Sequence, residues 1–175
     1  MAEIWDLYDK DGNKTDKTWE RTHGNYLNIP EGYYHLVCDI LIRNSDGSYL
    51  LTRRHPGKDV YPGFWEASCG GSAVSGEVSE ECARREMFEE TGIRGEDLQF
   101  INKTIRDHSH SIIYSYIADV DVPADSVVLQ EGETTDYKWV DAKGLIDYSE
   151  SETAIKTHVD RYRAFFDKLK DEING

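Results

Sequence analysis

One predicted helix, at residues 79–91, restricts how this chain can fold because its two sides differ. Ser79 is a suitable N-cap, and Gly92 is a residue type that commonly follows the last turn of a helix. Ala83 and Met87 are four residues apart, so they share an apolar side that can pack on a β-sheet. The sequence therefore predicts a helix that covers part of a sheet.

The same helix carries an excess of negative charge. Glu86, Glu89 and Glu90 stand at positions i, i+3 and i+4, so one helical face presents three carboxylates. Arg85 lies four residues before Glu89 and can pair with it, but one arginine cannot balance the whole set. That set also includes the nearby carboxylates of Glu77, Glu80 and Glu81. A cation is therefore expected to offset these charges.

A hard divalent cation suits this pattern. Mg²⁺ and Mn²⁺ take oxygen ligands, usually a few carboxylates together with waters and the phosphate oxygens of a substrate. The pair Gly70-Gly71, which precedes the helix, lets the backbone turn sharply and offer a carbonyl to the same ion. Charge clustering alone leaves a second interpretation open, namely an acidic helix face that is simply exposed to solvent.

Strand and helix patterns alternate along the chain. Strand-like segments occur at residues 3–9, 35–43, 49–53, 112–120 and 137–140. Residues 14–30 are polar, so we expect a short strand and an irregular segment to make up residues 1–34. Apolar residues recur at helical spacing from Ile155 to Ile173, which predicts a C-terminal helix at about 152–173. This order predicts a mixed α/β arrangement of stacked layers.

Length, charge and cysteine content narrow the class of protein. A chain of 175 residues suits a single domain over residues 1–175. The net charge of −14 disfavours a nucleic-acid polymer as partner, because phosphate backbones are bound by clustered positive charge. No apolar run approaches the ~18 residues typical of a membrane span. Three cysteines without metal-site spacing are typical of reduced thiols in a cytoplasmic protein.

Nine residues between positions 71 and 93 match a known motif at fixed spacing. They are Gly71, Glu77, Arg85, Glu86, Met87, Glu89, Glu90, Gly92 and Ile93. They fill every defined position of the Nudix box, G-x5-E-x7-R-E-U-x-E-E-x-G-U, in which U is an apolar residue. The chain therefore resembles a Nudix hydrolase. This resemblance implies an α/β/α sandwich with a central mixed β-sheet.

The resemblance also implies an activity and the residues that serve it. Nudix hydrolases use Mg²⁺ or Mn²⁺ to cleave a diphosphate linked to another group, such as a nucleoside diphosphate derivative or a similar small diphosphate. Carried over by position, Glu86, Glu89 and Glu90 resemble the metal ligands, with the carbonyl of Gly70 as a further one. Arg85 resembles the residue that orients these glutamates. Many members dimerise, so a homodimer is compatible with the resemblance.

The catalytic base is less well defined by the motif. In this family it lies either in the box or in a later loop, and Glu133 is the later candidate. Its segment leads into a strand at Trp139-Val140, which resembles the family's acidic loop before a Trp-Val strand. Glu131 and Asp136 compete with it, and a plain solvated loop is a further alternative.

The upstream half resembles one branch of the family, the type 1 isopentenyl diphosphate isomerases. The similarity rests on Tyr33 to His35, Leu50 to Arg54, Lys58, and Pro62 to Trp65. In those isomerases basic residues of this stretch contact the diphosphate. Arg53, Arg54 and Lys58 are therefore candidate substrate-binding residues, with surface solubility as the alternative reason for their presence.

The isomerase chemistry itself fits this chain poorly. It needs a cysteine followed two residues later by a metal-binding histidine, whereas Cys69 is one residue out of register and the histidine is missing. His35 matches an isomerase metal-ligand position, but its partners are not evident. We therefore expect a hydrolase of this branch. An isomerase and a non-catalytic domain that senses a nucleotide or diphosphate remain as alternatives, and the substrate itself is not identified.

Overall fold

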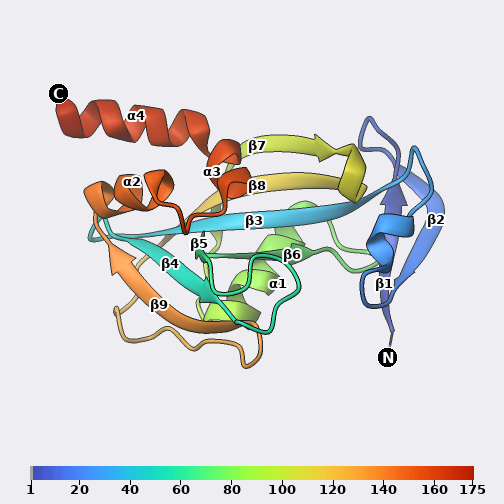
Figure 1. The fold of residues 1–175 in the computed structure, drawn as a ribbon, viewed down its shortest axis with the longest axis horizontal. Helices are drawn as coiled ribbons and strands as arrows, with labels where there is room; N and C mark the ends of the chain where they lie inside the picture. The colour runs from blue at the N-terminus through green and yellow to red at the C-terminus, as the bar shows by residue number, and fades with distance from the viewer. Residues whose placement is uncertain (1) are drawn as a thin grey trace.

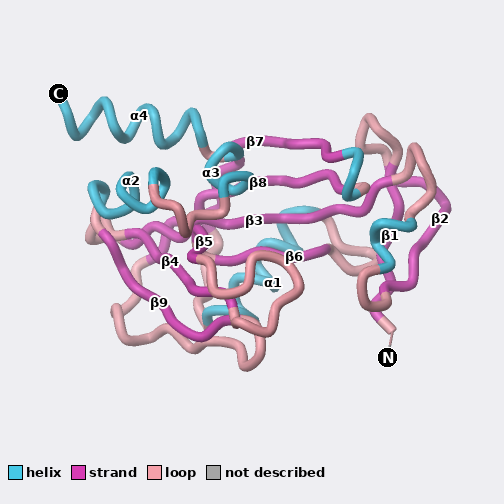
Figure 2. Tube along the Cα trace, viewed as in Figure 1, coloured by secondary structure: helices cyan, strands magenta, loops and turns pink. Residues whose placement is uncertain are grey.

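An eleven-residue strand, β3 (Tyr34–Asn44), runs through the middle of the sheet. The computed structural model describes residues 2–175 and is drawn in Figures 1 and 2. β3 pairs in parallel with β8 (Ser111–Val120) from His35 to Asn44. It pairs antiparallel with β1 (Glu3–Tyr8) at one end and with β6 (Cys69–Ser72) near its middle. Because parallel and antiparallel pairs occur together, the prediction of a central mixed sheet is confirmed.

The other strands extend the sheet on both sides of β3. β7 (Asp97–Arg106) pairs antiparallel with β8, and β2 (Lys14–Arg21) pairs antiparallel with β1. β4 (Tyr49–Arg54) joins β3 through a single residue pair and carries β9 (Thr134–Val140) and β5 (Trp65–Ala67) on its two edges, both antiparallel. The loop between β4 and β5, residues 55–64, therefore begins beside the first residue of β9.

Helices cover both faces of this sheet. Figure 1 shows α1 (Ser79–Thr91) on one side, and α2 (Ala142–Glu150), α3 (Lys156–Arg161) and α4 (Arg163–Asn174) on the other. The expected α/β/α sandwich is thus the observed architecture. Within residues 2–175, no helix has both the length and the apolar character needed to cross a membrane.

The alternation of side chains along β3 explains why two layers of helices are needed. Ile40 and Ile42 point into a core shared with Met87 of α1, whereas Leu41 points into a second core shared with Phe166 of α4. All three β3 side chains are fully buried. Successive residues of a strand face opposite sides of the sheet, so the consecutive apolar residues 40–42 require cover on both sides.

The helix that carries the motif spans residues 79–91, as its sequence predicts, but its N-cap lies one residue earlier than expected. Val78, not Ser79, is the N-cap, and its backbone N–H donates to the carboxylate of Glu81 at 3.1 Å. The Ser79 hydroxyl is instead hydrogen-bonded to the Tyr116 hydroxyl at 2.6 Å. At the other end Gly92 adopts the left-handed conformation (φ 71°) expected of a residue that ends a helix.

The segment at 152–173, expected as one helix, forms two helices that meet at Tyr162. Tyr162 has φ −100° and ψ 11°, outside the helical range, and its buried hydroxyl donates to the carbonyl oxygen of Tyr116 at 2.9 Å. Its neighbour Arg161 reaches Asp39 of β3. These two long-range contacts accompany the break, and helical spacing alone could not have indicated them.

The N-terminal segment is more regular than expected. Residues 14–30 were expected to be irregular, but β2 and a short 3-10 helix, η1 (Asn25–Asn28), occupy most of them. Trp19 of β2 stands directly opposite Trp5 of β1, and it packs against the small apolar cluster that Trp5 forms with Leu7 and Ile29. A second 3-10 helix, η2 (Asp107–Ser109), connects β7 with β8.

Candidate active site

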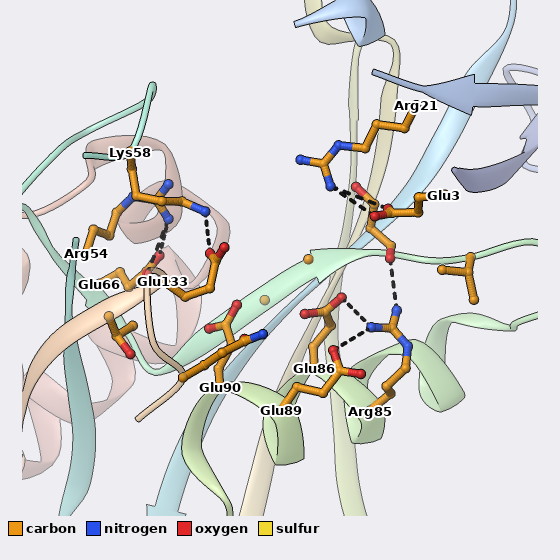
Figure 3. Close-up of a pocket in the computed structure, with 16 residues that line it drawn as sticks. Glu3, Arg21, Arg54, Lys58, Glu66, Arg85, Glu86, Glu89, Glu90 and Glu133 are labelled. Atoms are coloured by element: carbon orange, nitrogen blue, oxygen red, sulfur yellow. Dashed lines mark hydrogen bonds and ion pairs between the residues drawn. The ribbon is translucent and has the colours of Figure 1, made fainter. Parts of the chain in front are cut away.

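A cavity of about 290 Å³ lies beside the C-terminal half of α1. Figure 3 shows the charged side chains that converge on it. Its wall is formed by Glu3, Arg21, Arg54, Lys58, Glu66, Gly70, Gly71, Ser72, Val74, Arg85, Glu86, Glu89, Glu90, Gln130, Glu133 and Thr134. These residues come from the N-terminal hairpin, from β4 to β6 and the loops beside them, from α1, and from the loop that leads into β9.

Arg85 connects the acidic residues of the motif with one another. Its guanidinium donates to both carboxylate oxygens of Glu77, at 2.6 and 3.0 Å, and to the Ser72 carbonyl oxygen at 3.0 Å. The same group donates to Glu86 at 2.8 Å and to Glu89 at 3.1 Å. The hydrogen bonds that Arg85 donates to Glu77 are the main reason that the pKa of Arg85 lies above its usual value. Arg85 is therefore a permanent cation that fixes two carboxylates of α1.

The inner carboxylates of α1 are held in a buried, anionic setting. Burial raises the pKa of Glu86, while Arg85 opposes this shift. Glu90 is 7% exposed, and burial raises its pKa further, with the neighbouring carboxylates of Glu66 and Glu86 adding to the effect. Buried carboxylates that repel one another favour the arrival of a cation or a proton.

The chemistry of this wall fits a hard divalent ion. The four predicted ligands, Glu86, Glu89, Glu90 and the Gly70 carbonyl, all belong to residues of the wall and offer only oxygen atoms. A Cβ at Gly71 would lie 2.4 Å from the carboxylate of Glu86, so only glycine leaves room for that side chain. Within residues 2–175 no three acidic, His or Cys side chains are already gathered as a metal site. Their role as ligands remains a prediction.

Basic and acidic side chains alternate on the wall opposite α1. The Arg54 guanidinium contacts Glu66 at 3.3 Å and donates to the Val60 carbonyl oxygen at 3.0 Å. Burial raises the pKa of Glu66, which is 5% exposed, and Arg54 opposes the shift. The ammonium group of Lys58 forms an ion pair with Glu133. Both cations are thus close to carboxylates that an anionic ligand could displace.

The structure separates the remaining candidates for substrate binding and catalysis. Arg53 is exposed and donates to the Gly63 carbonyl oxygen at 3.0 Å, and it is not part of the cavity wall. Adjacent residues of a strand point in opposite directions, so Arg53 and Arg54 could not both have faced the cavity. Glu131 and Asp136 are exposed outside the wall, whereas Glu133 lies within it.

The two residues that suggested isomerase chemistry lie outside the wall. His35 is buried, stacks on Trp5 with ring centroids 4.1 Å apart, and donates from Nδ1 to the His110 carbonyl oxygen at 2.8 Å. Burial lowers its pKa to about 4. Cys69 is 2% exposed in β6, and burial raises the pKa of its thiol well above the usual value. Both environments are those of packed core residues.

Three charged residues of the wall, Glu3, Arg21 and Glu66, were not identified from the sequence. Glu66 was detectable in principle, as a single charge within the otherwise uncharged segment 61–76. Glu3 and Arg21 gave no local signal, because they reach the cavity only through the pairing of β1 with β2.

Comparison with known proteins gives a consistent result. A family model described as NUDIX domain matches residues 33–167. The uncharacterized Nudix hydrolase lmo0368 of Listeria monocytogenes is 32% identical over 144 residues, which cover 82% of each chain. The nucleoside triphosphatase NudI of Escherichia coli is 33% identical over 134 residues, which cover 70% of this chain and 92% of the relative. Neither name refers to an isomerase.

A solved structure supports the fold assignment. The crystal structure of DR0079 from Deinococcus radiodurans superposes with a TM-score of 0.68. The superposition covers 87% of this chain and 91% of the other, at 22% sequence identity. At this identity the likeness concerns the fold alone.

Proposed function

Because the chain belongs to the NUDIX domain family and is a Nudix hydrolase, we propose that it cleaves the diphosphate linkage of a nucleoside triphosphate or a related nucleoside diphosphate derivative, with Mg²⁺ or Mn²⁺. The observation behind the proposal is the cavity in which the carboxylates of α1 lie opposite Arg54 and Lys58. The name of the Escherichia coli relative, a nucleoside triphosphatase, supports the substrate class.

In this proposal the carboxylates of α1 hold the metal and Arg85 holds the carboxylates. Glu86, Glu89, Glu90 and the Gly70 carbonyl would be its ligands. A bound Mg²⁺ or Mn²⁺ neutralises phosphate oxygens and lowers the pKa of water. Arg85 keeps Glu86 and Glu89 in place through the hydrogen bonds described above.

The opposite wall would bind the substrate and accept the proton. Arg54 and Lys58 are positioned to donate to phosphate oxygens, since both carry positive charge into the cavity wall. A phosphate that binds the ammonium group of Lys58 would release Oε2 of Glu133 from its ion pair with Lys58. That oxygen could then accept the proton of the attacking water, which makes Glu133 the proposed general base.

The two alternative functions are isopentenyl diphosphate isomerisation and nucleotide sensing without catalysis. Isopentenyl diphosphate isomerisation gains no support, because Cys69 is buried in β6 and its thiol has a raised pKa. A sensor domain would bind nucleotides tightly without turnover. Neither is favoured by a specific observation in this structure.

The test is a substrate panel with matched variants. Nucleoside triphosphates, nucleoside diphosphate sugars and isopentenyl diphosphate are incubated with Mg²⁺ or Mn²⁺, and the release of phosphate, diphosphate or nucleotide is measured. Glu89→Gln and Glu90→Gln should each lower kcat by about 100-fold or more, because metal binding contributes several kcal/mol to catalysis. Glu80→Gln is the control on the same helix, since Glu80 is exposed and its one ion pair within residues 2–175 is with Arg84, at 3.8 Å.

The general base is tested by a second pair of variants. Glu133→Gln should lower kcat by about 10²- to 10⁴-fold, the usual contribution of general-base catalysis. Glu131→Gln, two residues away and outside the wall, should leave kcat unchanged. Full activity in both Glu89→Gln and Glu90→Gln would remove the metal-ligand assignment, and full activity in Glu133→Gln would remove the base.

A further inference from the structure

The N-terminal hairpin lies outside the region that the family model matches, yet it is attached to the loop that precedes α1. The carboxylate of Asp6 accepts hydrogen bonds from the Ser75 hydroxyl and the Gly76 N–H, both at 2.8 Å. The Ser75 N–H also donates to the Ile4 carbonyl oxygen at 2.7 Å. These three contacts fix the position of β1 relative to the motif.

This attachment brings one ion pair of the hairpin to the cavity. Glu3 and Arg21 stand directly opposite each other in β1 and β2, and both belong to the cavity wall. Glu3 is held by the indole N–H of Trp5, which donates to it at 2.6 Å. Arg21 lies over the ring of Trp5, with its Cζ 5.4 Å from the ring centroid. Two strands and an aromatic platform therefore orient the guanidinium.

Arg21 retains most of its hydrogen-bonding capacity. Only its Nη1 donates to Glu3, over long distances of 3.3 and 3.4 Å, and no other protein acceptor is found for the group among residues 2–175. Its side chain is half exposed. Arg85, by contrast, already donates to oxygen atoms of four residues. A ligand oxygen could therefore bind Arg21 without breaking a strong contact.

The position of Arg21 complements that of the other cations. Figure 3 shows Arg21 and Glu3 on one side of the acidic cluster (Glu86, Glu89 and Glu90), with Lys58 and Arg54 on the opposite side. A ligand that contacts the cations on both sides must therefore extend across the cluster. The residues that line the cavity include no aromatic side chain, so stacking of a nucleobase does not account for its shape.

We propose that Arg21 is a specificity-determining residue, which binds an anionic group that the substrate carries in addition to the two phosphates nearest Arg54 and Lys58. A nucleoside triphosphate has such a group in its third phosphate, whereas a nucleoside diphosphate sugar does not. The kinetic test of this inference rests on the proposed function, because it needs turnover. The binding that the inference predicts does not require turnover.

The kinetic test compares two substrates and two variants. Arg21→Gln should raise KM for a nucleoside triphosphate by about 10- to 100-fold, the usual effect of losing a charge-assisted hydrogen bond. Its kcat should change by less than about 3-fold, because Arg21 does not contact the carboxylates of α1. KM for a nucleoside diphosphate sugar should change little. Lys17→Gln, an exposed cation on the same strand and outside the wall, is the charge-matched control.

The binding test uses calorimetry with non-hydrolysable imido analogues of inorganic triphosphate and diphosphate, in the presence of Mg²⁺. The wild-type protein and Lys17→Gln should prefer the triphosphate analogue, and Arg21→Gln should lose that preference. An unchanged preference in Arg21→Gln overturns the proposal, as does an equal rise in KM for both substrates. If the wild-type protein hydrolyses no member of the panel, the proposed function fails, and the calorimetric comparison still decides the role of Arg21.

Discussion

Arg161 and Asp39 form a buried ion pair between α3 and β3, and replacing Arg161 should destabilise the fold strongly. The Nε atom of Arg161 lies 2.5 Å from Oδ2 of Asp39, and the two side chains are 6% and 5% exposed. In Arg161→Met the hydrocarbon volume is largely kept while the charge is removed. Asp39 would then remain as a buried carboxylate without its cation.

The expected loss follows from that burial. Removing one member of a buried ion pair typically costs about 3–5 kcal/mol, because the other charge stays desolvated. With a urea dependence of about 2 kcal/mol per molar, the unfolding midpoint should fall by roughly 2 M. Lys143→Met is the control, since Lys143 forms an exposed pair with Asp147 at 2.7 Å and its loss should leave the midpoint nearly unchanged.

The pH dependence provides a second, independent readout. Burial raises the pKa of Asp39, and Arg161 opposes that shift, so the variant should have a still higher folded-state pKa. A raised pKa means that protonated Asp39 favours the folded state at low pH, and that this benefit is lost as the pH rises through the folded-state pKa. The gap in unfolding free energy between wild type and Arg161→Met should therefore be wide at pH 7 and should narrow as the pH falls. A midpoint shift no larger than that of Lys143→Met, or a gap that widens in acid, would refute this reasoning.

Two further predictions concern the motif and the buried histidine. Gly71→Ala should abolish most activity, because the added Cβ would lie 2.4 Å from the carboxylate of Glu86. The circular dichroism of the folded protein should be retained. Near-normal activity would contradict the close packing of Gly71 against Glu86. His35 has a pKa of about 4, below the usual value of about 6.5, so its contribution to stability is complete above pH 6.5 and is lost as the pH falls toward 4. This amounts to about 3 kcal/mol, and urea titrations at both pH values should show that His35→Phe removes that part of the pH dependence.

The sequence was sufficient for the part of the site that a single helix creates. The face shared by Glu86, Glu89 and Glu90 follows from helical periodicity, and these three do lie together in the cavity wall. The opposite wall depends on strand pairing that periodicity does not reveal. β9 pairs with β4 with an irregularity in register between Arg53 and Arg54, and the loop that brings Glu133 to Lys58 follows from that pairing.

The errors in the fold have a similar origin. The strand at 14–21 has mostly polar residues, and its strand character comes from pairing with β1 rather than from its own composition. The break at Tyr162 accompanies contacts with residues more than forty positions away. Local patterns thus located the elements with strong periodicity, while long-range contacts determined where the others begin and end.

The attachment of the hairpin has a practical consequence for how this protein is produced. Glu3 is the first residue of β1 and also part of the cavity wall, so an affinity tag fused just ahead of it would emerge beside the reacting groups. The other terminus follows α4 and lies at the opposite end of the molecule in Figure 1. Kinetic measurements on tagged protein should therefore use a C-terminal tag, and a difference between the two tagged forms would report directly on access to the cavity.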